Sequence, residues 1–410
     1  MITFIQFTVI LDFMVLSPLS AILLKEMEIN AGQFSLLVSV YAFSAGASGL
    51  MAAGFADKFD RKRLLLFFYA GFVLGTVLCA QAASYELLLA ARIVTGVFGG
   101  VIGSISMAII TDIFPLGARG RVMGFVQMAF AASQVLGLPI GLYLAKESDW
   151  HAPFWMIVAV SAPIGIVILL YMRPIAEHLK LKAAKSPFLH LFRTLTNGEY
   201  LNGFAATILL ATGGYMLMPF GAAYGTNNLG LSMDDLPLLY LVTGLFTLFF
   251  GPLSGLLSDR FGKYNVFVAG CLVTMGMVGW YTNMGVTPLW IVVLTQVILF
   301  AGLTARMVSA SALVSAVPQP ADRGAFMVIN SSIQQISGGI SSAIAGMIVV
   351  NEPSGRLSHY DILGIVVMGT ITATMVLFGV VNRMILRRQL AEDVKRPAFP
   401  PFPNASEEAI

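Results

Sequence analysis

Charged residues are scarce in this chain of 410 residues. Asp, Glu, Lys and Arg make up 11% of it, whereas 57% of the residues are hydrophobic; soluble domains carry roughly 25% charged residues. This composition indicates a protein whose solvent is lipid. The formal net charge is only +3, so no concentration of positive charge points to a nucleic-acid partner.

Cysteine and histidine are nearly absent, which excludes several kinds of site. The two cysteines lie inside apolar runs, and they suggest neither a disulfide framework nor a zinc site. The four histidines all fall between the apolar runs, and neither H-E-x-x-H nor G-x-S-x-G occurs. Since an enzyme inside the membrane needs a nucleophile with its base, or metal ligands, we expect no enzymatic activity, no metal and no bound cofactor.

Long apolar runs, by contrast, occur repeatedly. A helix needs about 20 apolar residues to cross about 30 Å of hydrocarbon, and lipid requires every backbone polar group to be paired, which favours helices. We therefore expect an all-α membrane protein with twelve transmembrane helices. The expected spans are residues 3–24, 33–56, 63–83, 86–113, 120–145, 152–172, 199–224, 235–257, 264–284, 288–315, 323–350 and 361–386.

The two ends of the sequence differ. The first apolar run has no basic residue before it and is too long for the core of a signal peptide, so we interpret it as a span. Its abrupt start suggests that a short cytoplasmic leader precedes it. Residues 397–410 are polar and rich in Pro, and we expect the cytoplasmic tail 389–410 to be disordered.

Basic residues indicate the orientation. If both termini are cytoplasmic, all but five of the 24 Lys and Arg residues fall in segments on the cytoplasmic side. Three of those five lie in outside loops, and the other two, Arg92 and Arg306, lie within spans. Because cytoplasmic loops are enriched in Lys and Arg, we expect a multi-pass protein of the bacterial inner membrane with both termini inside.

An internal repeat divides the chain. GFADKFDRKR at residues 54–63 is similar to LLSDRFGKYN at residues 256–265, and each stretch follows the second span of its half. Registered repeats of this kind imply a duplicated fold. The expected organisation is two pseudo-symmetric six-helix bundles, residues 1–172 and 199–388, joined by a basic cytoplasmic linker at 173–198.

The second copy, GLLSDRFGK at residues 255–263, resembles the signature loop G-x-x-x-D-R-x-G-R/K of the major facilitator superfamily. The first copy departs from it, with Ala53 and Asp60 where glycines are usual. Arg92 and Gly96 resemble the basic motif of the fourth helix. GLPIG at residues 137–141 is similar to a motif of the 12-helix drug:proton and sugar-efflux (arabinose-efflux-permease-like) antiporters, although that motif usually has Gly and Pro adjacent.

This resemblance implies a cytoplasmic gate. Charges of the two signature loops would latch the halves together in the outward-facing state. The first cluster would be Asp57, Arg61 and Asp112, and Asp259 with Lys263 would mirror it in the second half. The alternative, a solvated basic loop, accounts for the cations but not for the two aspartates in register.

Asp12 is the acidic residue near the middle of the first span. A charge at the centre of a bilayer costs roughly 2.5–3.5 kcal/mol, so we expect Asp12 to face the bundle interior. Arg92, followed by small residues on one face of the fourth span, is the obvious partner. Burial favours the neutral carboxyl and a cation favours the carboxylate, a competition that suits proton coupling; the alternatives are a structural acid and helix packing.

Further polar residues within spans are candidates for a substrate cavity. Arg306 either faces the cavity and attracts anionic groups or extends toward one interface. Each of the other residues could instead make an ordinary hydrogen bond between helices. The candidates are Tyr41, Gln127, Gln134, Tyr215, Tyr240, Gln296, Arg306, Asn330 and Gln334.

These features predict a secondary transporter of a small molecule, working in the lipid bilayer as a monomer by alternating access. We expect a proton-coupled antiporter that exports an apolar or amphipathic compound, with protons as the coupling ion at Asp12 and Arg92. A proton-coupled importer or a uniporter of a sugar, an organic anion or a lipid-like metabolite would use the same parts. A sensor or scaffold that transports nothing would need no charge pair inside the bundle.

Overall fold

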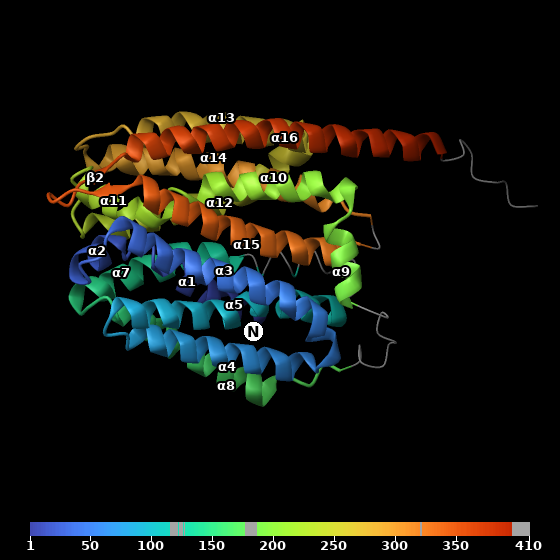
Figure 1. Cartoon of the computed structure of the whole chain (residues 1–410), viewed down its shortest axis with the longest axis horizontal. Helices are drawn as coiled ribbons and strands as arrows, with labels where there is room; N and C mark the ends of the chain where they lie inside the picture. The colour runs from blue at the N-terminus through green and yellow to red at the C-terminus, as the bar shows by residue number, and fades with distance from the viewer. Residues whose placement is uncertain (115–121, 123–125, 127, 177–186, 320–321, 396–410) are drawn as a thin grey trace, which may run out of the picture.

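The computed structural model describes residues 1–410 except 115–121, 123–125, 127, 177–186, 320–321 and 396–410, and its long helices run nearly parallel (Figure 1). The first half contains α1 (Ile2–Val15), α2 (Ser20–Glu26), α3 (Ala31–Phe55), η1 (Ala56–Lys58), α4 (Arg61–Ala80), α5 (Tyr85–Ile113), η2 (Ser133–Gly137), α7 (Leu138–Glu147) and α8 (Ala152–Tyr171). The second half contains α10 (Gly198–Tyr215), η4 (Met218–Phe220), α11 (Gly221–Asn227), α12 (Asp235–Phe261), α13 (Lys263–Tyr281), α14 (Leu289–Ser315), α15 (Arg323–Ile348) and α16 (Tyr360–Lys395). Between the halves stands α9 (Pro187–Leu195), and the antiparallel strands β1 (Val350–Asn351) and β2 (Leu357–Ser358) precede α16.

The expected all-α membrane fold is confirmed. Ten of the described helical segments are long and apolar enough to cross a membrane, and α1 with α2, bent by 51°, makes an eleventh. The twelfth expected span corresponds to α15, which is rich in Ser, Gly and Gln. Because α15 packs against α3 and α10, much of its surface meets protein instead of lipid, and it does not need a uniformly apolar sequence.

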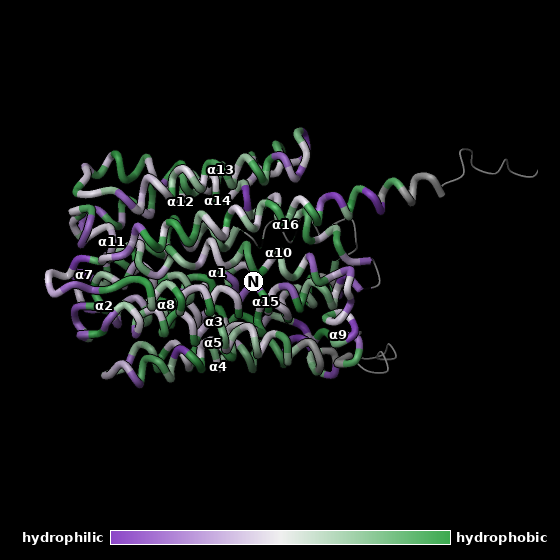
Figure 2. The backbone as a smooth tube through the Cα atoms, turned by 45° about the horizontal axis from the view of Figure 1, so that its top comes forward, coloured by the Kyte–Doolittle hydropathy of each residue, from purple (hydrophilic) through white to green (hydrophobic). Residues whose placement is uncertain are grey.

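Polar caps mark where several helices begin, at the two ends of the bundle. Asn30 and Gln33 form a reciprocal capping box at the start of α3. The side chains of Asp60 and Ser84 accept hydrogen bonds from backbone N–H groups in the first turns of α4 and α5. Such caps satisfy N–H groups that have no partner within the helix. Figure 2 shows the hydrophilic residues gathered toward these ends, with apolar residues along the length between them.

The two halves meet along α3 and α15, and again where η2 and α7 pack on α12. We call the two ends of the bundle the Arg61 end, which includes α9, and the Trp150 end, which includes α2, α11 and the hairpin. A Cβ on Gly346 of α15 would lie 2.4 Å from the Cβ of Ser35 of α3. Glycine at position 346 is therefore what allows the halves to approach closely near the Trp150 end.

The structure adds a detail to one expectation about the segments outside the bundles and corrects another. The linker 173–198 includes a helix, α9, which lies across the Arg61 end in contact with α3 and α15 (Figure 1). The tail 389–410 was expected to be disordered, but residues 389–395 continue α16 to Lys395. This stretch, QLAEDVK, includes Leu, Ala, Glu and Lys, which are strong helix formers. Residues 396–410 lie outside the described part of the chain.

Candidate functional site

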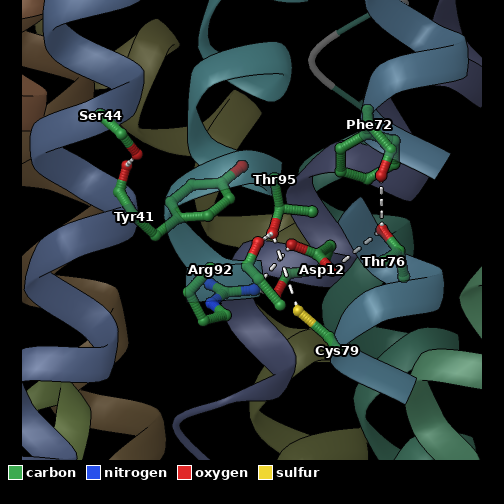
Figure 3. A network of polar contacts seen from close by, with 9 residues as sticks. Asp12, Tyr41, Ser44, Phe72, Thr76, Cys79, Arg92 and Thr95 are labelled. Atoms are coloured by element: carbon green, nitrogen blue, oxygen red, sulfur yellow. Dashed lines mark hydrogen bonds and ion pairs between the residues drawn. The ribbon is translucent and has the colours of Figure 1, made fainter. Parts of the chain in front are cut away.

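A buried ion pair lies inside the first half. Asp12 of α1 and Arg92 of α5 are both fully buried, and Nη1 of Arg92 lies 2.8 Å from Oδ2 of Asp12 (Figure 3). The same nitrogen donates to the backbone oxygen of Asp12 at 3.2 Å. The structure therefore brings together the two residues that the sequence pairs, and Asp12 faces the bundle interior.

Small polar side chains surround the pair. Thr76 Oγ1 lies 3.5 Å from Oδ1 of Asp12 while it donates to the backbone oxygen of Phe72 at 3.0 Å. The Cys79 Sγ is 3.7 Å from Thr95 Oγ1, and Thr95 donates to the preceding turn of α5. The Thr76 contact is at the limit of hydrogen-bond length, so Arg92 is the main partner of the carboxylate.

Burial limits the chemistry that this pair can perform. A guanidinium stays protonated in proteins, so Asp12 is the member of the pair that can accept a proton. Removing the charge of one partner from a buried ion pair is costly because the other charge is left uncompensated. Arg92 is already incompletely satisfied, since its Nε and Nη2 have no hydrogen-bond partner in the described part of the chain. The arrangement can therefore alternate between an ion pair and a neutral acid beside a cation.

Tyr41 covers the other side of Arg92. The Cζ of Arg92 lies 4.4 Å from the centre of the Tyr41 ring, within the range of a cation–π interaction. The ring of Phe13 is 5.4 Å from that of Tyr41 and 6.0 Å from that of Tyr215, on α10 of the second half. Two predicted cavity residues from opposite halves, Tyr41 and Tyr215, thus both pack on Phe13. Sequence reasoning missed Phe13 because one aromatic residue in an apolar run gives no distinct signal.

Arg306 of α14 lies inside the second half. It is fully buried, and its Nη2 donates to the backbone oxygen of Leu210 at 3.0 Å. Its Nε and Nη1 have no hydrogen-bond partner among the described residues. Nη2 also lies 3.3 Å from the position that a Cβ on Gly213 would take. Complete burial against α10 is incompatible with the expectation that Arg306 extends to an interface.

The remaining cavity candidates are scattered. Asn330 accepts a hydrogen bond from Thr207 at 2.6 Å, joining α15 to α10. This is the ordinary contact between helices that was the alternative interpretation, and Gln296 on α14 is not joined to the Asp12 pair by any described contact. Gln134 on η2, half-buried Gln334 on α15 and Tyr240 on α12 are not joined to the Asp12 pair by any described contact. Gln127 lies outside the described residues.

Two of the residues predicted for the cytoplasmic gate contact each other at the Arg61 end, and the gate between the halves stays a prediction. Arg61 Nε lies 3.0 Å from Oδ2 of Asp112, and its Nη1 donates to the backbone oxygen of Ala56. This cluster joins α4 to α5 within the first half. The side chain of Asp57 lies outside what the structure describes. In the second half Asp259 and Lys263 are exposed and form no ion pair with any described residue.

Contacts between the halves gather at the Trp150 end, and sequence reasoning did not identify them. Ser17 donates to the backbone oxygen of Met218, and Ser20 Oγ accepts from the N–H of Ala223 at 3.1 Å. Ser35 donates to the backbone oxygen of Ser342. An exposed ion pair of Lys146 with Asp234 joins α7 to the loop before α12. The repeated Ser and Gly residues of α15 indicate a helix packed against protein, but they do not identify the serines that bind across the halves.

No metal centre is visible in the part of the chain that the structure describes, where no group of three or more His, Cys, Asp or Glu side chains converges.

Similarity to known proteins extends over about two thirds of the chain in two bacterial relatives. YceJ of Bacillus subtilis (strain 168), described as an uncharacterized MFS-type transporter, is 27% identical over 272 residues, which are 66% of this chain and 68% of that protein. A probable sugar efflux transporter of Helicobacter pylori (strain G27) is 24% identical over 251 residues, 60% of this chain and 63% of the relative. Both are described as transporters.

Solved structures give the same fold. The crystal structure of the nucleoside transporter NupG superposes with a TM-score of 0.71 at 13% identity, over 93% of this chain and 97% of that one. The sequence profile of the Major Facilitator Superfamily matches residues 2–220 and again residues 203–405, once for each half. The chain therefore belongs to the Major Facilitator Superfamily, a family of multi-pass membrane transporters of small molecules and not of enzymes.

Proposed function

We propose that the chain is a proton-coupled antiporter that exports a small apolar or amphipathic compound across the bacterial inner membrane. The observation that carries this proposal is the fully buried pair of Asp12 and Arg92, 2.8 Å apart. Ionisable residues are rare within membrane spans and commonly mark proton or substrate pathways. The similarity to a probable sugar efflux transporter supports the direction of transport.

In the proposed cycle, a proton on Asp12 and a substrate in the central region compete for the same conformational state. Arg92 tunes the competition because it stabilises the carboxylate form of Asp12. Moving one charge through 100 mV supplies about 2.3 kcal/mol, which supports a substrate gradient of about fiftyfold. No other energy source is needed for export.

The orientation follows from the charges. We assign the Arg61 end to the cytoplasm because the basic loops of the chain lie there, and the termini are then also cytoplasmic. The contacts of Ser17, Ser20 and Ser35 with the second half would close the outer end. The arrangement described here would then be the inward-facing member of the cycle, with the chain acting as a monomer.

The test compares the wild type with Asp12→Asn in an efflux-deficient bacterial host, at matched expression, against a panel of lipophilic growth inhibitors. We expect raised tolerance to one or more compounds in the wild type and loss of that tolerance in the variant. Asp361→Asn is the matched control, because it removes an exposed carboxylate at the start of α16. Tolerance that survives Asp12→Asn would contradict proton coupling at Asp12.

A second candidate function is transport of an organic anion, by proton-coupled import or by uniport. The observation that favours it is Arg306, a buried cation with two unpartnered nitrogens and no described carboxylate beside it. Uptake of radiolabelled organic anions into cells that carry the wild type or Arg306→Gln tests this candidate. Uptake that requires Arg306, without any raised tolerance in the panel above, would replace export by this function.

A further inference from the structure

The Arg92 guanidinium lies between two groups that attract a cation, of which one can be neutralised by a proton and the other cannot. On one side is the Asp12 carboxylate, 2.8 Å from Nη1; on the other is the Tyr41 ring, 4.4 Å from Cζ. The carboxylate loses its charge when it binds a proton, whereas the ring keeps its negative face. Since Arg92 remains a cation in either case, its described partners when Asp12 is neutral are the backbone oxygen of Asp12, 3.2 Å from Nη1, and the Tyr41 ring, which is the one of the two on another helix.

Tyr41 is held in a narrow slot between α3 and α5. A Cβ on Gly99 would lie 2.9 Å from the Tyr41 hydroxyl, and a Cβ on Gly96 would lie 2.6 Å from the Tyr41 backbone oxygen. Any side chain at either glycine would displace the tyrosine. The Tyr41 ring therefore has little freedom to move toward α5. A change in its attraction to Arg92 would instead displace it relative to the Phe13 ring.

That other side leads to the second half. Phe13, the residue after Asp12, lies 5.4 Å from the Tyr41 ring and 6.0 Å from the Tyr215 ring. The Tyr215 ring in turn packs on Gly338 of α15, where a Cβ would lie 2.8 Å from it. Aromatic contacts thus run without interruption from Arg92 to α15, the helix that forms the main contact with α3.

Few groups could replace this connection. The titratable or charged side chains around Asp12 are Arg92 on α5, Cys79 on α4 and Tyr41 on α3. Of the other elements packed on α1, α8 and η2 contain no acidic, basic, histidine or cysteine residue, and the charges of α7 lie in its last turn. Loss of the Asp12 charge is therefore felt first by Arg92 and then by the Tyr41 ring.

We propose that Tyr41 is a positioning residue that transmits the protonation state of Asp12 to the contact between the halves, through Arg92 on one face and through Phe13 and Tyr215 on the other. This inference rests on the proton coupling proposed above and adds to it a named route. Tyr41 acts through Arg92 and does not itself exchange the proton.

The experiment measures the opening of the Trp150 end without a substrate. Spin labels on Ser148→Cys and Ser354→Cys, both exposed and in opposite halves, report the distance between the halves in lipid nanodiscs from pH 5 to pH 8. The buried native cysteines stay in place. We expect the wild-type populations to shift with pH and Asp12→Asn to hold the low-pH population at every pH.

Two substitutions separate the ring from the hydroxyl. Tyr41→Phe keeps the π face and should keep the wild-type response, whereas Tyr41→Leu should reduce the pH-induced change in the population ratio about tenfold, as expected for loss of a desolvated cation–π contact. Phe154→Leu is the matched control, because it removes another fully buried ring from the same half, on α8 and without a described contact to Arg92, Tyr41 or Phe13, and it should keep the response. If Tyr41→Leu does not fold, Phe13→Leu breaks the next contact and should give the same loss.

The outcomes distinguish the two proposals. A wild-type response that persists in both Tyr41→Leu and Phe13→Leu would overturn this inference and leave proton coupling intact. An equal loss in Tyr41→Phe and Tyr41→Leu would assign the effect to the hydroxyl and also overturn it. A wild type whose distances do not change with pH, and do not differ from Asp12→Asn, would overturn the proton coupling and this inference with it.

Discussion

Arg306 donates to the backbone oxygen of Leu210 at 3.0 Å, and no carboxylate in the described part of the chain pairs with it. Burying a charge is costly, and even a buried ion pair can often be replaced with apolar residues of similar size at no cost or with a gain of about 1–4 kcal/mol. We expect Arg306→Met to raise the apparent unfolding temperature in detergent. A lower temperature would show that Arg306 is a structural residue.

The same change at Arg92 should have the opposite effect. Arg92→Met would leave the Asp12 carboxylate buried without its cation, and breaking a buried pair in this way costs about 3–5 kcal/mol. The double variant Asp12→Leu with Arg92→Met removes both charges and should recover most of that loss. Unfolding temperatures of the two single variants and the double variant measure the coupling. Additive effects would mean that the two side chains do not interact strongly.

Gly346 controls how closely the halves approach near the Trp150 end. A Cβ there would lie 2.4 Å from the Cβ of Ser35, so Gly346→Val should force α15 away from α3. We expect the label distance between Ser148→Cys and Ser354→Cys to increase. Gly369→Val is the control, because a Cβ at Gly369 meets nothing within 4 Å. An unchanged distance in Gly346→Val would mean that α3 and α15 yield locally instead of separating.

Asp322 should give the Arg61 end a dependence on acid pH. It accepts from the Tyr200 hydroxyl at 2.7 Å and lies 3.0 Å from Nε2 of His190 on α9. These two contacts, the Tyr200 hydrogen bond first, hold the pKa of the Asp322 carboxyl below its ordinary value. Because the folded-state pKa is the lower one, this stabilisation is present above the unfolded pKa of about 3.9 and is lost as the pH falls through the folded value.

Asp322→Asn should therefore lower the unfolding temperature between pH 5 and pH 7, and the difference from the wild type should shrink as the pH falls below the unfolded pKa of about 3.9. The difference should be small, of the order of 1 kcal/mol or less, because the carboxylate is partly exposed. Asp361→Asn, at an exposed carboxylate of α16, is the comparison variant. A difference between wild type and Asp322→Asn that grows toward acid pH would have the wrong sign for this explanation.

The pairing of Asp12 with Arg92 could be predicted from the sequence because charges within apolar spans are few, and the cost of burying them leaves few possible partners. The serine contacts of Ser17, Ser20 and Ser35 could not, because small polar residues are common in membrane helices and only the packing decides which of them face the other half. The sequence also left open whether the Arg306 side chain points into the bundle or toward an interface. Its burial depends on how α14 is rotated against α10, and no residue type reports that rotation.

The helical continuation of residues 389–395 had a sequence signal that the polar composition obscured. Local helix propensity there is high, and polarity alone does not distinguish a solvated helix from a disordered tail. Phe13 shows the converse limit. Its role in the contacts between Tyr41 and Tyr215 depends on three rings from two halves meeting in space, which no local pattern records.

The linker helix α9 has a consequence for the range of motion. It is nine residues long and contacts both α3 and α15, and at 1.5 Å per residue it is about 13 Å long. While α9 stays docked, this length limits how far the two halves can part at the Arg61 end. At the Trp150 end the halves share no covalent connection, and only side-chain and backbone contacts hold them together. The linker thus joins the halves at the Arg61 end only, and the openings at the two ends of the bundle need not be equally wide.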